Sequence, residues 1–238
     1  MEYFLFALIL ALANIVQAIT GFAGGPLAMP PSIALVGIND AKASITLIFL
    51  LSTAVITFTN IKYINPKKLG IMILFMVIGM IPGLWLYDRL PTKILMIVYG
   101  VIVVGIGIWK LIGKGKPIEN KYLLYLALIM AGAMQGMFTS GGPFLALYAT
   151  VAISEKKEFR ATVSAVWTIL NIYLCYNMLT QGMYNSKTIN LTLVSIVPVA
   201  AAIVVGNIIN KKIKQETFIK LVYILLIVSG GILLLNAL

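Results

Sequence analysis

The sequence predicts an all-α polytopic integral membrane protein with two inverted repeats, each of about four spanning helices plus one short, broken helix. The first reason is composition: 61% of the residues are hydrophobic, 11% are charged and the mean hydropathy is +1.03, so the polar surface cannot cover a soluble globule. The second reason is a succession of ten apolar segments along the chain. The third is a Gly-Gly-Pro break that occurs once in each half.

Helices are expected at the ten apolar segments. Crossing roughly 30 Å of hydrocarbon takes about 20 residues at 1.5 Å each, and eight of the segments come near this length. The other two, 26–37 and 143–153, are too short, and each begins at or directly after a Gly-Gly pair. The ten segments are residues 3–20, 26–37, 43–61, 69–87, 94–112, 122–138, 143–153, 161–180, 188–209 and 218–238.

The segments repeat in order. The series long, short, long, long, long occurs twice, which is typical of an internal repeat. Residues 1–113 are the predicted first membrane repeat and residues 118–238 the second, in a single membrane domain with no soluble domain. The stretch Asp40–Ser44 corresponds to Glu158–Thr162, with an acidic and then a basic residue before Ala-Ser or Ala-Thr.

The two breaks, Gly21–Pro26 and Thr139–Pro143, interrupt apolar sequence. Glycine costs about 1 kcal/mol in a helix interior and proline about 3, so each break ends one helix, and its proline fits the first turn of the next. A helix start leaves backbone N–H groups without partners, and broken helices in membranes are common anion sites. We therefore expect two hairpin tips that present N–H groups to a ligand.

The basic residues predict the orientation. If each break is a hairpin tip, fourteen Lys and Arg residues lie on one side of the membrane and four on the other, whereas parallel halves divide them eight to ten. The positive-inside rule favours the first arrangement. The protein is then a multi-pass protein of the inner or plasma membrane, with both termini extracytoplasmic and the loops near 62–68, 114–121 and 211–214 in the cytoplasm.

Catalytic and metal chemistry are not expected. The chain has no histidine and one cysteine, Cys175, and its seven carboxylates lie near the ends of apolar runs. No general base, metal-ligand set or cofactor motif lies at membrane depth, which argues against an intramembrane enzyme. We predict no catalytic residues, no metal ligands, no cofactor and no nucleic-acid partner.

The chain resembles the sulfite exporter TauE/SafE family, also called the 4-toluene sulfonate uptake permeases. The resemblance runs through the whole chain: GFAGGP and TSGGP near the start of each half, the Ala-Ser/Thr helix openings, and about eight membrane helices in two related halves. It implies a secondary transporter, and most simply an exporter, of sulfite, organosulfonates or related small sulfur anions. A passive anion channel, a carrier of another small organic anion and a structural membrane subunit are the alternatives.

Eleven residues are candidates for binding the small anionic substrate. The glycines of the breaks are the first group, and close helix packing is their alternative role. Polar residues at membrane depth are the second group, with hydrogen bonding between helices as the alternative. Two cations, one expected at each mouth of the pathway, are the third group, with snorkelling as the alternative. The candidates are Gly24, Gly25, Gly141 and Gly142; Asn14, Gln17, Gln135, Asn171 and Trp167; and Lys42 and Arg160.

The only other partner that the sequence predicts is the lipid bilayer, and the oligomeric state is left open. A net charge of +11 suits an anion carrier, although the positive-inside rule alone would also load the cytoplasmic loops with Lys and Arg.

Overall fold

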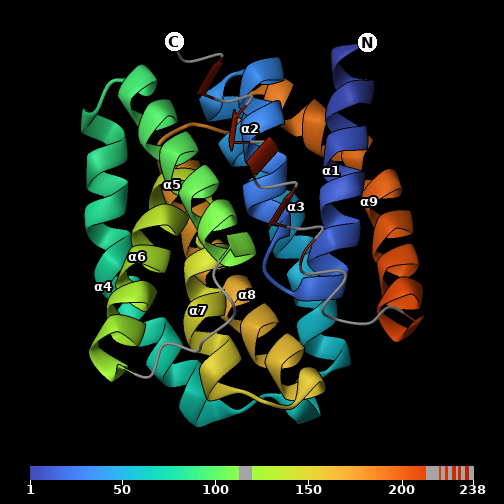
Figure 1. The fold of residues 1–238 in the computed structure, drawn as a ribbon. Helices are drawn as coiled ribbons and strands as arrows, with labels where there is room; N and C mark the ends of the chain where they lie inside the picture. Colours follow the sequence, from blue (N-terminus) through green and yellow to red (C-terminus); the bar gives the residue numbers. More distant parts are fainter. Residues whose placement is uncertain are drawn as a thin grey trace.

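A computed structural model describes residues 1–112, residues 120–212 and scattered residues between 220 and 235 (Figure 1). Over the first two ranges the chain forms helices and no strand, which confirms the all-α prediction. The helices are α1 (Glu2–Thr20), α2 (Gly24–Val36), α3 (Ile38–Thr59), η1 (Ile61–Tyr63), α4 (Pro66–Arg89), α5 (Thr92–Ile112), α6 (Lys121–Phe138), α7 (Gly142–Ala152), α8 (Lys156–Thr180) and α9 (Ser186–Lys212).

Six of the described helices are long and apolar enough to cross a membrane, namely α1, α3, α4, α6, α8 and α9. Helix α5 has 21 residues and corresponds to the predicted segment 94–112. Residues 114–117, which separate the two predicted repeats, lie outside the described residues, as does most of the predicted last segment, 218–238. The chain is therefore a polytopic membrane protein, and the inverted relation of its halves remains a prediction.

Both breaks end a helix in a left-handed backbone conformation. Gly21 has φ of 83° and its N–H donates to the carbonyl of Gln17, which closes α1. Thr139 closes α6 in the same way with φ of 53°, although a side chain makes this conformation unfavourable. The helices that follow, α2 and α7, have 13 and 11 residues, so they are about 20 and 17 Å long and neither spans a bilayer.

Ion pairs define the two ends of the helix bundle. Lys187 lies 2.8 Å from Glu2 and 3.6 Å from Asp40, so the starts of α1, α3 and α9 meet at one end, which we call the N-terminal end. Lys68 lies 2.8 Å from Glu158, so the starts of α4 and α8 meet at the opposite end, which we call the basic end. Each short helix therefore returns to the end at which the preceding helix began, α2 to the N-terminal end and α7 to the basic end (Figure 1).

Glycines let α4 and α6 approach closely. A Cβ atom added at Gly79 would lie 1.8 Å from the carbonyl oxygen of Ile129, and one at Gly83 would lie 2.4 Å from the carbonyl oxygen of Ala133. On α6, a Cβ atom added at Gly132 would lie 1.9 Å from the carbonyl oxygen of Met76, and one at Gly136 would lie 2.7 Å from that of Met80. This is the small-residue packing of membrane helices, in which backbones touch without intervening side chains.

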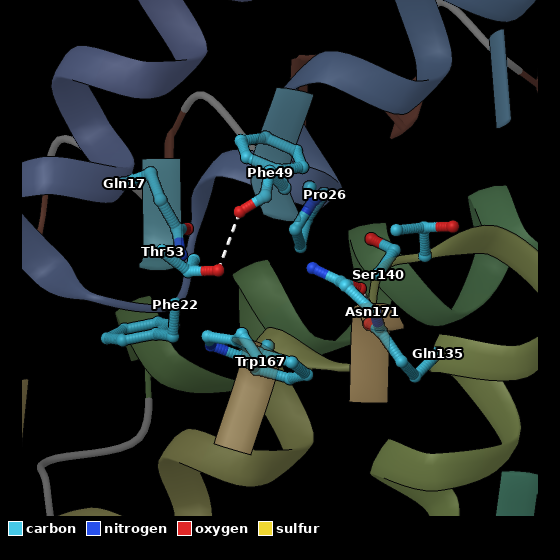
Figure 2. A pocket seen from close by; sticks show the side chains of 12 residues that line it. Gln17, Phe22, Pro26, Phe49, Thr53, Gln135, Ser140, Trp167 and Asn171 are labelled. Atoms are coloured by element: carbon cyan, nitrogen blue, oxygen red, sulfur yellow. Dashed lines mark hydrogen bonds between the residues drawn. The ribbon is translucent and has the colours of Figure 1, made fainter. Parts of the chain in front are cut away.

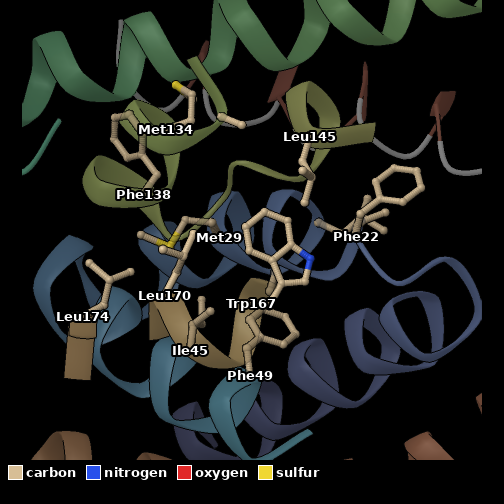
Figure 3. Packing of buried hydrophobic residues seen from close by; sticks show 14 of the residues in the cluster. Phe22, Met29, Ile45, Phe49, Met134, Phe138, Leu145, Trp167, Leu170 and Leu174 are labelled. Atoms are coloured by element: carbon tan, nitrogen blue, oxygen red, sulfur yellow. The ribbon is translucent and has the colours of Figure 1, made fainter. Parts of the chain in front are cut away.

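The apolar core surrounds the two breaks. Figure 3 shows aromatic and methionine side chains from both halves of the chain packed together, among them Phe22, Phe138 and Trp167. Large apolar side chains also cover the outside of the bundle; Phe58 is 71% exposed and Val197 is 76% exposed. An apolar exterior around a packed interior is the arrangement that a bilayer stabilises.

Candidate functional site

The two breaks touch each other inside the bundle. A Cβ atom added at Gly25 would lie 2.5 Å from the carbonyl oxygen of Thr139, and one added at Gly142 would lie 1.8 Å from the carbonyl oxygen of Phe22. Real side chains do not fit at such distances. Gly25 and Gly142 are therefore glycine because the backbone of one break lies directly against the backbone of the other.

A glutamine accepts a hydrogen bond from the helix start at each break. The Oε1 atom of Gln17 accepts from the backbone N–H of Gly24 at 2.9 Å. The Oε1 atom of Gln135 accepts from the backbone N–H of Gly141 at 3.1 Å. Each of these N–H groups belongs to the first turn of a short helix or to the residue before it, where no intrahelical acceptor is available. The same contact is thus made once in each half.

Helix α8 holds both breaks through side-chain hydrogen bonds. The indole N–H of Trp167 donates to the carbonyl oxygen of Gly21 at 2.9 Å, and Nε2 of Gln17 donates to the same oxygen at 3.1 Å. On the other side, Nε2 of Gln135 donates to Oδ1 of Asn171 at 2.8 Å. A movement of α8 relative to α1 or α6 would therefore change the hydrogen bonding of both breaks.

A cavity of about 20 Å³ lies between the breaks, which is room for about one water molecule. Figure 2 shows its lining side chains facing one another, with Gln17 and Thr53 on one side and Gln135 on the other. Six of the predicted site residues line the cavity: Gln17, Gly25, Gln135, Gly142, Trp167 and Asn171. Six residues that were not predicted complete it: Phe22, Pro26, Phe49, Thr53, Thr139 and Ser140.

Two of these additional residues carry a signal in the sequence. Phe49 precedes Trp167 by 118 positions, and Thr53 precedes Asn171 by the same interval. The same offset separates Asp40 from Glu158, which the repeat had already paired. The alignment of the two halves could therefore have extended the candidate site from α8 to α3.

The central cavity is lined by polar groups and contains no charged side chain. Its lining has an indole N–H, amide groups and the hydroxyls of Thr53, Thr139 and Ser140, and it has no carboxylate. The N-terminal ends of α2 and α7 both begin at the cavity wall, and a helix N-terminus carries about half a positive charge. Such a lining could stabilise an anion through neutral donors.

Gly24, Gly141 and Asn14 are buried but do not line the central cavity. Gly24 and Gly141 contribute the N–H groups bound by the two glutamines. Asn14 donates from Nδ2 to the carbonyl oxygen of Leu10 at 2.8 Å, and its Oδ1 has no partner in the described chain.

The two predicted mouth cations lie at opposite ends of the bundle. Lys42 is 2% exposed near the N-terminal end, and its Nζ lies 3.3 Å from the centre of the Tyr87 ring. The Tyr87 hydroxyl donates to Oδ1 of Asn39 at 2.7 Å, which holds the ring over the lysine. Arg160 lies at the basic end beside a second, larger cavity. Neither cation reaches the central cavity.

Comparison with known proteins agrees with these features. The sequence profile of the family described as "Sulfite exporter TauE/SafE" matches residues 5–233. The chain is also similar to "Probable inner membrane transporter protein TsaS" of Comamonas testosteroni, with 22% identity over 175 residues that cover 72% of this chain and 73% of the relative. No solved structure gives a significant match. The chain is a multi-pass membrane transporter and belongs to the sulfite exporter TauE/SafE family.

Proposed function

We propose that the protein is a secondary transporter that exports small sulfur-containing anions, such as sulfite or organosulfonates, and binds them between the two breaks. One observation carries the proposal: two helix N-termini, each bonded to a glutamine, meet at a buried cavity that is lined by hydrogen-bond donors and has no carboxylate. The family name supports the choice of sulfur oxyanions.

The donors suit the chemistry of a sulfonate or sulfite group. Such a group has three oxygens that accept hydrogen bonds from several directions, and neutral donors in a water-poor site bind it without a competing counter-ion. Trp167 and Phe49 add apolar surface for a short organic substituent. The glutamines can rotate their amide groups, so Nε2 of Gln17 or Gln135 can turn from its present acceptor to the substrate.

Substrate binding requires the breaks to separate, because a cavity for about one water molecule cannot hold a sulfonate. We propose that the two repeats are inverted and rock against each other around the breaks, which exposes the cavity to each side in turn. Helix α2 runs from the cavity toward the N-terminal end and α7 runs from it toward the basic end. The positive-inside rule assigns the basic end to the cytoplasm and both termini to the outside.

Counterflow in proteoliposomes tests the proposal. Liposomes loaded with unlabelled sulfite or methanesulfonate should accumulate the labelled anion transiently, and the initial rate should saturate with concentration. A rate that rises linearly, with no transient accumulation, would mean a passive channel. Absence of both signals for sulfite and for a set of organosulfonates would remove the proposed substrate class.

A further inference from the structure

A second cavity, of about 580 Å³, lies at the basic end between the end of α3, the start of α8 and the end of α9. We call it the vestibule. Three of its eight lining residues are cations and none is acidic. The lining residues are Thr59, Asn60, Tyr63, Lys156, Lys157, Arg160, Asn207 and Asn210.

The vestibule cations make contacts that leave their charge unneutralised. Arg160 donates from Nη2 to Oδ1 of Asn207, and its buried Nε has no partner within the described chain. Lys156 donates from Nζ to a backbone carbonyl at 3.0 Å. The Nζ of Lys157 lies 5.3 Å from the centre of the Tyr63 ring. In the described part of the chain none of the three forms an ion pair.

The nearest carboxylates on α8 are already occupied. Glu158 accepts hydrogen bonds from Lys68 at 2.8 Å and from Nδ2 of Asn65 at 2.9 Å. Glu155 accepts from the backbone N–H groups of Lys157 and Glu158 and so closes the start of α8. The vestibule lining consequently has an excess of positive charge, which comes from its three cationic side chains.

One face of α8 leads from the vestibule to the central cavity. Arg160, Ser164 and Trp167 are spaced by four and three residues, so they lie on the same side of the helix. Ser164 is buried, and its hydroxyl has no partner in the described chain. Gly21 lies between the two cavities. Its carbonyl oxygen accepts a hydrogen bond from Trp167, which lines the central cavity. A Cβ atom added at Gly21 would lie 3.9 Å from Cα of Arg160, which lines the vestibule.

We propose that the vestibule is a second anion site, which binds an oxyanion of the sulfonate or phosphate type. A transported anion binds there before or after it occupies the central cavity. That the vestibule lies on the transport route rests on the proposed function. That it binds an anion follows from its three cations, which form no ion pair in the described chain. Arg160 supplies the planar donor group and the lysines supply charge. The oxyanion can come from solution or from an anionic lipid headgroup, since the donors recognise both.

Cysteine modification tests the site without a transport measurement. In a Cys175→Ser background, Thr59→Cys places a thiol in the vestibule wall and Tyr122→Cys places one on α6 outside the vestibule. We compare the rates with sulfonatoethyl methanethiosulfonate, an anion, and trimethylammonioethyl methanethiosulfonate, a cation. The anionic reagent should be favoured at Thr59→Cys by about ten-fold more than at Tyr122→Cys. Arg160→Gln and Lys157→Gln should reduce this preference, and Lys67→Gln, an exposed control on α4, should leave it unchanged.

Competition identifies the source of the oxyanion. Protection of Thr59→Cys by methanesulfonate in nanodiscs of phosphatidylcholine supports a site for soluble anions. Protection only when phosphatidylglycerol is added supports a site for lipid headgroups. Equal reagent preference at both thiols, or no protection by either anion, overturns the inference. Since none of these readouts uses transport, the vestibule site can fail while counterflow succeeds, or succeed while counterflow fails.

Discussion

The side chain of Gln135 joins the second break to α8, because its Oε1 accepts from the N–H of Gly141 at 3.1 Å while its Nε2 donates to Oδ1 of Asn171 at 2.8 Å. An acidic replacement separates these two roles. In Gln135→Glu the carboxylate still accepts from Gly141, and a negative charge near the start of α7 is favourable for the helix. Asn171 can turn its amide and donate to the new carboxylate.

We therefore expect Gln135→Glu to fold and to lose anion binding, because the carboxylate repels the substrate. The affinity for the transported sulfonate should fall by at least ten-fold, measured by calorimetry or by the thermal shift that the anion induces. Gln135→Leu, which loses the helix-start contact, should instead lower the melting temperature. Unchanged affinity in Gln135→Glu would place the substrate away from this cavity.

Contact between the breaks makes Gly142 sensitive to the smallest side chain. The Cβ of Gly142→Ala would lie 1.8 Å from the carbonyl oxygen of Phe22, a backbone atom that cannot move alone. We expect a loss of about 1–3 kcal/mol in the free energy of unfolding, as for other overpacked cores. Gly70→Ala on α4 is the control, since a Cβ there meets no atom within 4 Å. Equal melting temperatures for both variants would contradict the observed approach of the breaks.

Valine at Gly24 or Gly141 cannot separate binding from packing. A Cβ at Gly141 would lie 2.1 Å from the carbonyl oxygen of Ala131, and one at Gly24 would lie 2.7 Å from Cβ of Gln17. Both valine variants should therefore lose stability together with binding. The glutamine variants above are the better probes of the anion site.

Lys42 is a buried cation whose observed contact is the Tyr87 ring. Lys42 forms no direct ion pair within the described chain, and Asp88 interacts with it only at longer range, so burying its charge is costly. Lys42→Met, of similar length, should therefore keep or raise the melting temperature. If the lysine attracts the anion on its way through the N-terminal end, the same variant should transport several-fold more slowly. Tyr87→Phe keeps the ring and should preserve transport. Full transport by Lys42→Met would leave the lysine a packing role only.

The orientation of the bundle is tested by thiol labelling in intact cells. On a Cys175→Ser background, an impermeant maleimide should label Lys93→Cys, near the start of α5, and should not label Lys67→Cys at the basic end. Permeabilised cells should allow labelling of both positions, which controls for exposure. Labelling of Lys67→Cys in intact cells would reverse the proposed orientation.

The breaks and their glutamines were predictable because the residue types at these positions identify them without any knowledge of the packing. Gly-Gly-Pro disfavours a continuous helix, and Gln17 and Gln135 are polar residues in apolar runs. The contact of Lys42 with Tyr87 was not predictable, since it joins the start of α3 to the end of α4 and depends on how those helices pack. The left-handed conformation of Thr139 was not predictable either, because threonine rarely adopts a positive φ. Surrounding contacts hold it in place, including a 2.9 Å hydrogen bond between the hydroxyls of Thr139 and Thr46.

The last prediction concerns energy coupling, and it follows from which groups can titrate. The chain has no histidine, and no carboxylate lines the central cavity. Asp40 lies at the N-terminal end beside Lys187, and Glu158 lies at the basic end beside Lys68, so both are far from the midpoint of the bundle. A proton relay through the membrane normally uses such side chains at depth.

An anion leaving a cell that is negative inside gains about 2.3 kcal/mol per charge per 100 mV, so the membrane potential alone can drive export. We therefore expect transport in sodium-free proteoliposomes to be electrogenic, to run outward under an inside-negative potential and to persist when the pH gradient is collapsed. The measurement is flux of a labelled alkyl sulfonate under potentials set with valinomycin, because this anion stays ionised and does not cross lipid as a neutral acid. Accumulation driven by a pH gradient at zero potential would show that protons are coupled by groups other than those at the central cavity.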